Sequence, residues 1–149
     1  MYVPHLKFSR WALWEERNDL KNISSPGVYM IAITRKRLRG RKALCRDVDY
    51  IGMTNAKNGL YGRLTGFNHA ILGRGGHSGG NSVHDDLGNY NKWRKKLYVC
   101  IMPRTKIEVD KNHRKPKDIK AMGIVSYLEF AALAEYKKKV GKEPKYNKK

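Results

Sequence analysis

A glutamate interrupts an apolar pattern near the C-terminus of the chain. Between residues 125 and 136, apolar side chains recur at steps of three and four, which predicts a helix with one buried face; they are Val125, Leu128, Ala132, Leu133 and Tyr136. Glu129 lies on this face, and carboxylates are rarely buried without a partner. A carboxylate on a rigid helix can anchor one Mg²⁺ ion whose other ligands are water and phosphate oxygens. The alternative is a structural salt bridge to one of the many lysines.

Short motifs elsewhere in the chain accompany this glutamate. They are Gly27-Val28-Tyr29, Tyr50-Ile51-Gly52, Arg63 within GLYGRL, and Gly141, Pro144 and Asn147 after Glu129. In this order and spacing they resemble the GIY-YIG nuclease family over residues 26–147, with Val28 where the family has isoleucine. The resemblance implies an endonuclease of the restriction or phage type. Such an enzyme uses Mg²⁺, which Mn²⁺ can replace, to hydrolyse phosphodiester bonds of double-stranded DNA to 5′-phosphate and 3′-hydroxyl ends.

The resemblance also implies a role for each motif residue. Tyr29 matches the family tyrosine that acts as general base or relays the proton of the attacking water, and Tyr50 hydrogen-bonds the phosphate or orients the water. A phenol has a pKa of about 10, so nearby positive charge must lower it. Arg63 suits a phosphate oxygen because its guanidinium is forked, and Glu129 is the metal ligand. The competing interpretation is structural, with both tyrosines as strand aromatics and Arg63 as an exposed helix cation.

The residue that would assist the tyrosine base is not where the family has it. Many members carry a histidine or tyrosine one helical turn after the arginine, and this chain has Phe67 there. His69 is the nearest imidazole, but six residues beyond Arg63 is about 600° of rotation on a regular helix, so His69 points away from it. Either the helix is irregular near Gly66, or another group accepts the proton. We consider His69 a candidate catalytic residue and His77 a weaker candidate. The competing interpretation for both is that the histidine lies on the surface or contacts DNA.

The elements that must position these residues are expected to form an α/β domain, with a small, mostly antiparallel three-stranded sheet flanked by helices. The expected strands are 28–34, 47–53 and 97–103. The expected helices are 9–22, 55–74, 85–96 and the C-terminal helix that carries Glu129, which Gly141 ends. The segment 73–82 contains five glycines and is expected to be a flexible loop. We expect one domain over residues 1–149, with an N-terminal helix and a basic C-terminal tail.

The charge of the chain predicts a polyanionic partner. Its 149 residues include 32 Lys and Arg against 13 Asp and Glu, a net charge of +19, which exceeds what solubility requires. Cys45 and Cys100 form no metal-binding pair, so we expect two free thiols. The N-terminus has no apolar signal-peptide core, and no apolar run approaches the roughly 20 residues needed to span a bilayer. We therefore expect a soluble, cytoplasmic protein.

Three segments are expected to contact DNA. The stretch 35–46 has seven basic residues and no acidic one, and the tail 137–149 has seven lysines and one glutamate. The glycine-rich segment could order over DNA as a flap, although a flexible linker is equally expected. The candidate DNA-binding residues are Arg35, Lys36, Arg37, Arg39, Arg41, Lys42, Arg74, His77, Asn81 and Asn147.

A second function class shares this composition. A non-catalytic basic nucleic-acid-binding protein, such as a ribosome-associated factor, would have the same charge. Such a protein has no need for Glu129 on an apolar stripe with Tyr29, Tyr50 and Arg63 in order. If the chain is a nuclease with one active site, a double-strand cut would need a homodimer on DNA or two sequential nicks.

Overall fold

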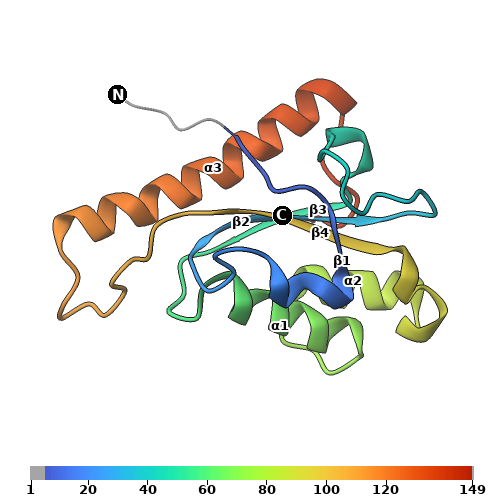
Figure 1. Ribbon diagram of the computed structural model, residues 1–149, viewed down its shortest axis with the longest axis horizontal. Coiled ribbons are helices and arrows are strands. Elements are labelled where there is room, and N and C mark those ends of the chain that lie inside the picture. The colour runs from blue at the N-terminus through green and yellow to red at the C-terminus, as the bar shows by residue number, and fades with distance from the viewer. Residues whose placement is uncertain (1–5, 149) are drawn as a thin grey trace.

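The computed structural model describes residues 6–148, in which a sheet is covered by helices on both faces (Figure 1). The sheet is antiparallel and has four strands in the order β1-β4-β2-β3. The strands are β1 (Ala12–Leu13), β2 (Gly27–Ile33), β3 (Tyr50–Thr54) and β4 (Leu97–Pro103). The helices are α1 (Gly59–Ile71), α2 (Ser78–Leu87) and α3 (Pro116–Val140). In Figure 1, α3 crosses one face of the sheet, and α1 and α2 cover the other.

Side chains of β2 alternate between two cores, because successive residues of a strand point to opposite faces. Val28 and Met30 pack with Leu128 of α3 in one buried cluster. Tyr29 and Ile31 belong to the other cluster, which includes residues of α1 and α2. The same alternation continues along β4. Both faces of the central strands are therefore buried, and the α/β class that the sequence predicted is confirmed.

The sheet has one strand more than predicted, and the predicted helix 9–22 is wrong. Ala12 and Leu13 pair with β4 as β1, and a six-residue 3₁₀ helix (Trp14–Asp19) follows. The tryptophans explain the error. A helix would bring Trp11 and Trp14 to one face, but the two residues lie in different core clusters, on opposite sides of the sheet. A two-residue strand is too short to show a periodicity of its own.

The glycine-rich segment also differs from the prediction, because α2 begins inside it at Ser78. His77 caps this helix: its side chain accepts the backbone N–H of Gly80. Helix α2 ends where Gly88 adopts a φ of 70°, so the predicted helix 85–96 is wrong beyond Leu87. Two three-residue 3₁₀ turns, Tyr90–Lys92 and Arg94–Lys96, follow. The cap and the packing of the glycines, described below, override the low helix propensity of this segment.

Other predicted elements are confirmed with shifted ends. Strands β2 and β4 match 28–34 and 97–103 within one residue, and α1 occupies the centre of 55–74. Strand β3 begins at Tyr50 rather than at 47, because Cys45–Asp47 forms a 3₁₀ turn. Gly141 caps α3 in the left-handed region with a φ of 89°. Among the helices of residues 6–148, none combines the length and the apolar character that crossing a bilayer requires.

Candidate functional site

Residues from four distant parts of the chain line one cavity of about 540 Å³, which we call the Glu129 cavity. Tyr50 comes from β3, Arg63 from α1, Glu129 from α3 and Asn147 from the C-terminal tail. Tyr50, Arg63 and Glu129 are three of the residues that the sequence analysis selected for catalysis. Because Arg63 and Glu129 come from helices on opposite faces of the sheet, the cavity lies at the free edge of β3, where both faces can be reached (Figure 1).

Glu129 has an unusual environment for a surface carboxylate. It is partly buried on α3, and within residues 6–148 it takes part in no ion pair and no side-chain hydrogen bond. Burial raises the pKa of Glu129, and the charge of Arg63 partly offsets this rise. The lysine salt bridge that was the alternative for Glu129 is therefore not present in this part of the chain. A cation bound in the cavity would offset the free-energy cost of removing the carboxylate from water.

Arg63 also carries an unmet bonding capacity. Its Nε atom is buried and has no hydrogen-bond partner in the described residues. A buried donor without an acceptor is costly, and a guanidinium donates in a fork that matches phosphate or carboxylate oxygens. The charge of Arg63 also favours the ionised forms of Tyr29, Tyr50 and Glu129. Arg63 is thus positioned to bind an anion, and its charge offsets part of the rise in pKa that burial causes in its three neighbours.

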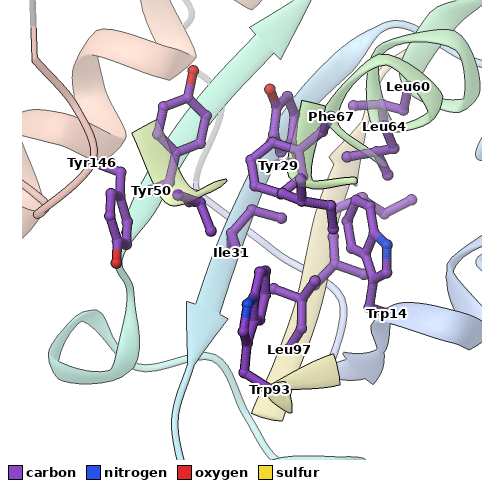
Figure 2. Packing of buried hydrophobic residues seen from close by; sticks show 14 residues of the cluster. Trp14, Tyr29, Ile31, Tyr50, Leu60, Leu64, Phe67, Trp93, Leu97 and Tyr146 are labelled. Carbon is purple, nitrogen blue, oxygen red and sulfur yellow. The ribbon is translucent and has the colours of Figure 1, made fainter. Parts of the chain in front are cut away.

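The two motif tyrosines share one core cluster but differ in their access to the cavity. Tyr50 lines the Glu129 cavity, whereas Tyr29 is fully buried and does not line it. Their ring centroids are 6.1 Å apart, and Figure 2 shows both hydroxyl groups pointing to the same side from neighbouring strands. Burial is the main cause that raises the pKa of each phenol. In this arrangement Tyr50 is the phenol that can meet a ligand in the cavity.

His77 lies behind Tyr29. It is 3% exposed, and its Nε2 is 2.7 Å from the Tyr29 hydroxyl. Its Nδ1 accepts the N–H of Gly80, so in the neutral ring the proton is on Nε2, which then donates to the Tyr29 oxygen. Burial and the charge of Arg63 lower the pKa of His77 to about 4. His77 is therefore an uncharged hydrogen-bond donor to Tyr29 at neutral pH. Because its side chain is buried, the prediction that His77 contacts DNA is not supported by its position.

Two glycines allow the tyrosines to lie where they do. A Cβ on Gly52 would come within 2.5 Å of the Tyr29 ring, and a Cβ on Gly79 would come within 2.5 Å of the Tyr50 ring. Gly52 faces Tyr29 across the β2–β3 pair, whereas Gly79 comes from the start of α2. Neither the role of Gly79 nor the His77 cap was predicted from the sequence. Their only local signal is a histidine followed by small residues, and the contacts of His77 with Tyr29 and of Gly79 with Tyr50 join residues distant in sequence.

Asn147 braces the free edge of β3. Its Oδ1 accepts the N–H of Ile51 at 2.9 Å, and its Nδ2 donates to the Ile51 carbonyl at 2.8 Å. The tail is held further by Tyr146, whose backbone N–H donates to the Asp49 carbonyl and whose hydroxyl donates to Asp86 of α2 at 2.6 Å. Asn147 thus uses its amide on the neighbour of Tyr50 rather than presenting it to DNA. Tyr146 was not singled out from the sequence.

Other candidate residues lie apart from the Glu129 cavity. His69, Arg74 and Asn81 are exposed, and none of them lines it. The basic segment 35–46 is held down rather than free, because Trp11 bonds through its backbone to Gly40 and Arg41. Around it is a hollow of about 650 Å³ lined mainly by basic residues, among them Arg10, Lys36, Arg37, Arg41, Lys42 and Arg46.

Two of the expected DNA contacts in this segment have acidic partners. Arg39 forms two bonds of 2.7 Å with Glu16, and Lys36 pairs with Asp47 at 2.9 Å. Arg35, Arg37, Arg41 and Lys42 are exposed, and each lies outside the ion pairs found in residues 6–148. Those four residues are therefore better placed than Arg39 to bind phosphate.

A different group of residues could hold a metal ion. Glu108, Asp110 and His113, in the connection between β4 and α3, are exposed and can offer ligand atoms that lie within 4.8 Å of one another. His113 already pairs with Asp110 at 2.8 Å. This group shares no residue with the Glu129 cavity. This group was not predicted from the sequence.

Comparison with known proteins gives no relative: no protein-family model, no curated protein and no solved structure matches the chain.

Proposed function

We propose that this protein is a DNA endonuclease that uses Mg²⁺, or Mn²⁺ in its place, to hydrolyse phosphodiester bonds to 5′-phosphate and 3′-hydroxyl ends. The observation that carries the proposal is the convergence of Tyr50, Arg63 and Glu129 on one cavity from three separate elements. A phosphodiester needs a positioned water, neutralisation of its developing charge and support for its leaving oxygen. The three residues bring a phenol, a guanidinium and a carboxylate to one place, as the GIY-YIG resemblance implies.

Glu129 is the residue that would hold the metal ion. Within residues 6–148 Glu129 is partly buried and forms no ion pair, which suits Mg²⁺, an ion that takes one or two protein carboxylates and completes its shell with water and phosphate oxygens. When bound, the ion supplies Lewis-acid stabilisation of phosphate charge. The cluster at Glu108 lies outside the cavity and is not needed for this chemistry.

The protein groups divide the remaining work. Arg63 binds a non-bridging oxygen of the phosphate through donors that include Nε, which has no partner among residues 6–148. Tyr50 orients the attacking water and, in its phenolate form, takes the proton of that water, since it is the phenol at the cavity wall. Tyr29 acts from the second layer, where His77 donates to its oxygen and so favours a negative charge there. This assigns to Tyr50 the contact with water that the resemblance gives to Tyr29, and His77, rather than His69, assists the phenols.

Binding of DNA rests on the charge of the protein. The net charge of +19 attracts a polyanion, and the exposed cations of segment 35–46 and of the tail supply phosphate contacts. Arg35, Arg37, Arg41 and Lys42 carry this part of the proposal. Double-strand cleavage would need a homodimer or two successive nicks.

The test is cleavage of supercoiled plasmid with and without Mg²⁺ by the protein and two variants. Glu129→Gln should abolish nicking and retain DNA binding, because the amide keeps the shape of the side chain and loses its charge. Glu135→Gln is the matched control: Glu135 lies on the same helix and pairs with Lys139 outside the cavity, so cleavage should persist. Intact plasmid with Mg²⁺ at several salt concentrations, together with tight DNA binding, would favour the non-catalytic binding protein instead.

A further inference from the structure

Phe130 is the most exposed large apolar side chain in the part of the chain that the structure describes. It is 67% exposed, follows Glu129 directly in α3 and lines the same cavity. Single exposed apolar residues are common on protein surfaces. This one differs because its ring borders a cavity that also contains Arg63 and Lys148. A phenyl ring next to cations is the arrangement that binds a molecule with both a flat apolar face and a negative charge.

We propose that Phe130 stacks on an unpaired nucleobase next to the phosphate that Arg63 binds. The inference rests on the proposed function for the identity of that phosphate. A nucleotide has both required parts, since its phosphate can meet the guanidinium while the base covers the ring. Aromatic side chains stack on bases in this way in many proteins that bind single strands. The overall charge of +19 selects the same class of ligand over an apolar or cationic one.

This contact has a consequence for substrate choice. In an intact duplex both faces of each base are covered by the neighbouring base pairs, so a protein ring cannot stack on it. Phe130 can reach only a base that is unpaired, extrahelical or at an end. The protein is therefore expected to prefer DNA with an unpaired nucleotide beside the cleaved bond over a fully paired duplex.

Tyr127 provides a matched control on the same helix. It is also an exposed aromatic, at 49%, and precedes Phe130 by three residues, but it does not line the Glu129 cavity. If any exposed ring of α3 promoted binding through general hydrophobicity, the two residues would behave alike. If stacking at the cavity is responsible, only Phe130 matters.

The experiment measures binding without cleavage, in EDTA, by fluorescence anisotropy. The probes are two labelled duplexes of the same sequence, one fully paired and one with a single unpaired 2-aminopurine. The unchanged protein should prefer the second probe. Phe130→Ala should weaken its binding roughly tenfold, within the range of base stacking on aromatic residues, and Phe130→Trp should restore it. Tyr127→Ala should leave the preference unchanged.

Three results would overturn the proposal: no preference for the unpaired probe, equal affinity of Phe130→Ala and the unchanged protein, or an equal loss in Tyr127→Ala. Circular dichroism of each variant checks its fold, which an exposed side chain should not disturb. Because the assay contains no metal, it is independent of catalysis. Stacking without plasmid cleavage would reject the nuclease alone, and cleavage without an effect of Phe130 would reject the stacking alone.

Discussion

His77 donates its Nε2 proton to the phenol oxygen of Tyr29 across 2.7 Å, because its Nδ1 is occupied by the backbone N–H of Gly80. One imidazole thus joins the cap of α2 to the second layer of the Glu129 cavity. This hydrogen bond stabilises the phenolate form of Tyr29. His77 cannot accept the phenol proton at Nε2, because this nitrogen already carries a proton in the neutral ring. It also makes the fold sensitive to acid.

The stability of the protein should fall between about pH 6.5 and pH 4. The pKa of His77 is lowered to about 4, below the value of about 6.5 expected when the chain unfolds. The unfolded state therefore binds the proton first, so this contribution is complete above pH 6.5 and is lost as the pH falls to about 4. The loss should reach about 3 kcal/mol. Urea unfolding at a series of pH values measures it.

His77→Asn separates this effect from general acid denaturation. An asparagine oxygen can still cap α2, but it does not titrate in this range. The variant should be less stable at neutral pH and should show a flatter pH dependence. His69→Asn, which changes an exposed histidine of α1, should keep the original slope. Equal slopes in the protein and His77→Asn would contradict the assignment.

Removal of the two phenols should have unequal effects. Tyr50→Phe takes away the hydroxyl at the cavity wall, and we expect it to slow cleavage by about 10²-fold or more. Tyr29→Phe should cost less, because Tyr29 is fully buried and acts through its neighbours. The pKa values of both phenols are raised by burial, so the rate should climb with pH above neutrality. Single-turnover rates against pH test this, and a larger loss in Tyr29→Phe would reverse the roles.

Gly79→Ala should displace the ring of Tyr50, because the new Cβ would come within 2.5 Å of it. Overpacking of this kind costs about 1–3 kcal/mol, and cleavage should fall with it. Gly123→Ala in α3 is the control: a Cβ there meets nothing within 4 Å, so the change should stabilise the helix by up to about 1 kcal/mol. Thermal unfolding and plasmid nicking measure both variants. If Gly79→Ala changed neither the stability nor the cleavage rate, the ring of Tyr50 would tolerate another position.

Asn147→Ala should destabilise the fold by about 1–3 kcal/mol, because both backbone groups of Ile51 lose their partner. Hydrogen exchange of the Ile51 amide should become faster. Asn81→Ala changes an exposed asparagine of α2 and should leave both quantities unchanged. Unaltered exchange at Ile51 in Asn147→Ala would mean that water replaces the amide without cost.

The affinity for DNA should fall steeply as salt rises, and the arginines of segment 35–46 should contribute unequally. Arg41→Ala should reduce the slope of log K against log salt by about 0.9, the value for one phosphate contact. Arg39→Ala should change it less, because this guanidinium is paired with Glu16 through two bonds. Anisotropy titrations at several salt concentrations test the contrast. Equal effects would mean that DNA displaces Glu16.

The sequence revealed those parts of the fold that have a local pattern. The stripe around Glu129 follows from helical spacing, and β2 and β4 follow from short runs of apolar, β-branched and aromatic residues; the structure has all three elements. Strand β1 and the start of α2 escaped prediction, because one depends on pairing with β4 and the other on the cap by His77. The first contact joins residues far apart in the sequence, and the second lies in a glycine-rich segment that has no helical pattern.

The candidate site, like the fold, could be predicted from the sequence only in part. Tyr50, Arg63 and Glu129 were selected through their resemblance to a family motif, and the fold brings them to one cavity. That Tyr50 lines the cavity while Tyr29 is fully buried could not be read from the sequence, because it depends on how His77 and Gly79 pack against the two rings. Asn147 was assigned to DNA for its polar side chain, and its pairing with Ile51 appears only when the tail folds back.

That pairing also concerns how molecules of this protein behave toward one another. An edge strand with unpaired amide and carbonyl groups can pair with the edge strand of a second molecule, which leads to oligomers and fibres. Strand β3 is such an edge strand, and the Asn147 carboxamide bonds the Ile51 amide and carbonyl groups that a strand of a second molecule would otherwise pair with. Shortening the chain before residue 147 should therefore reduce colloidal stability at high concentration, quite apart from any effect on chemistry.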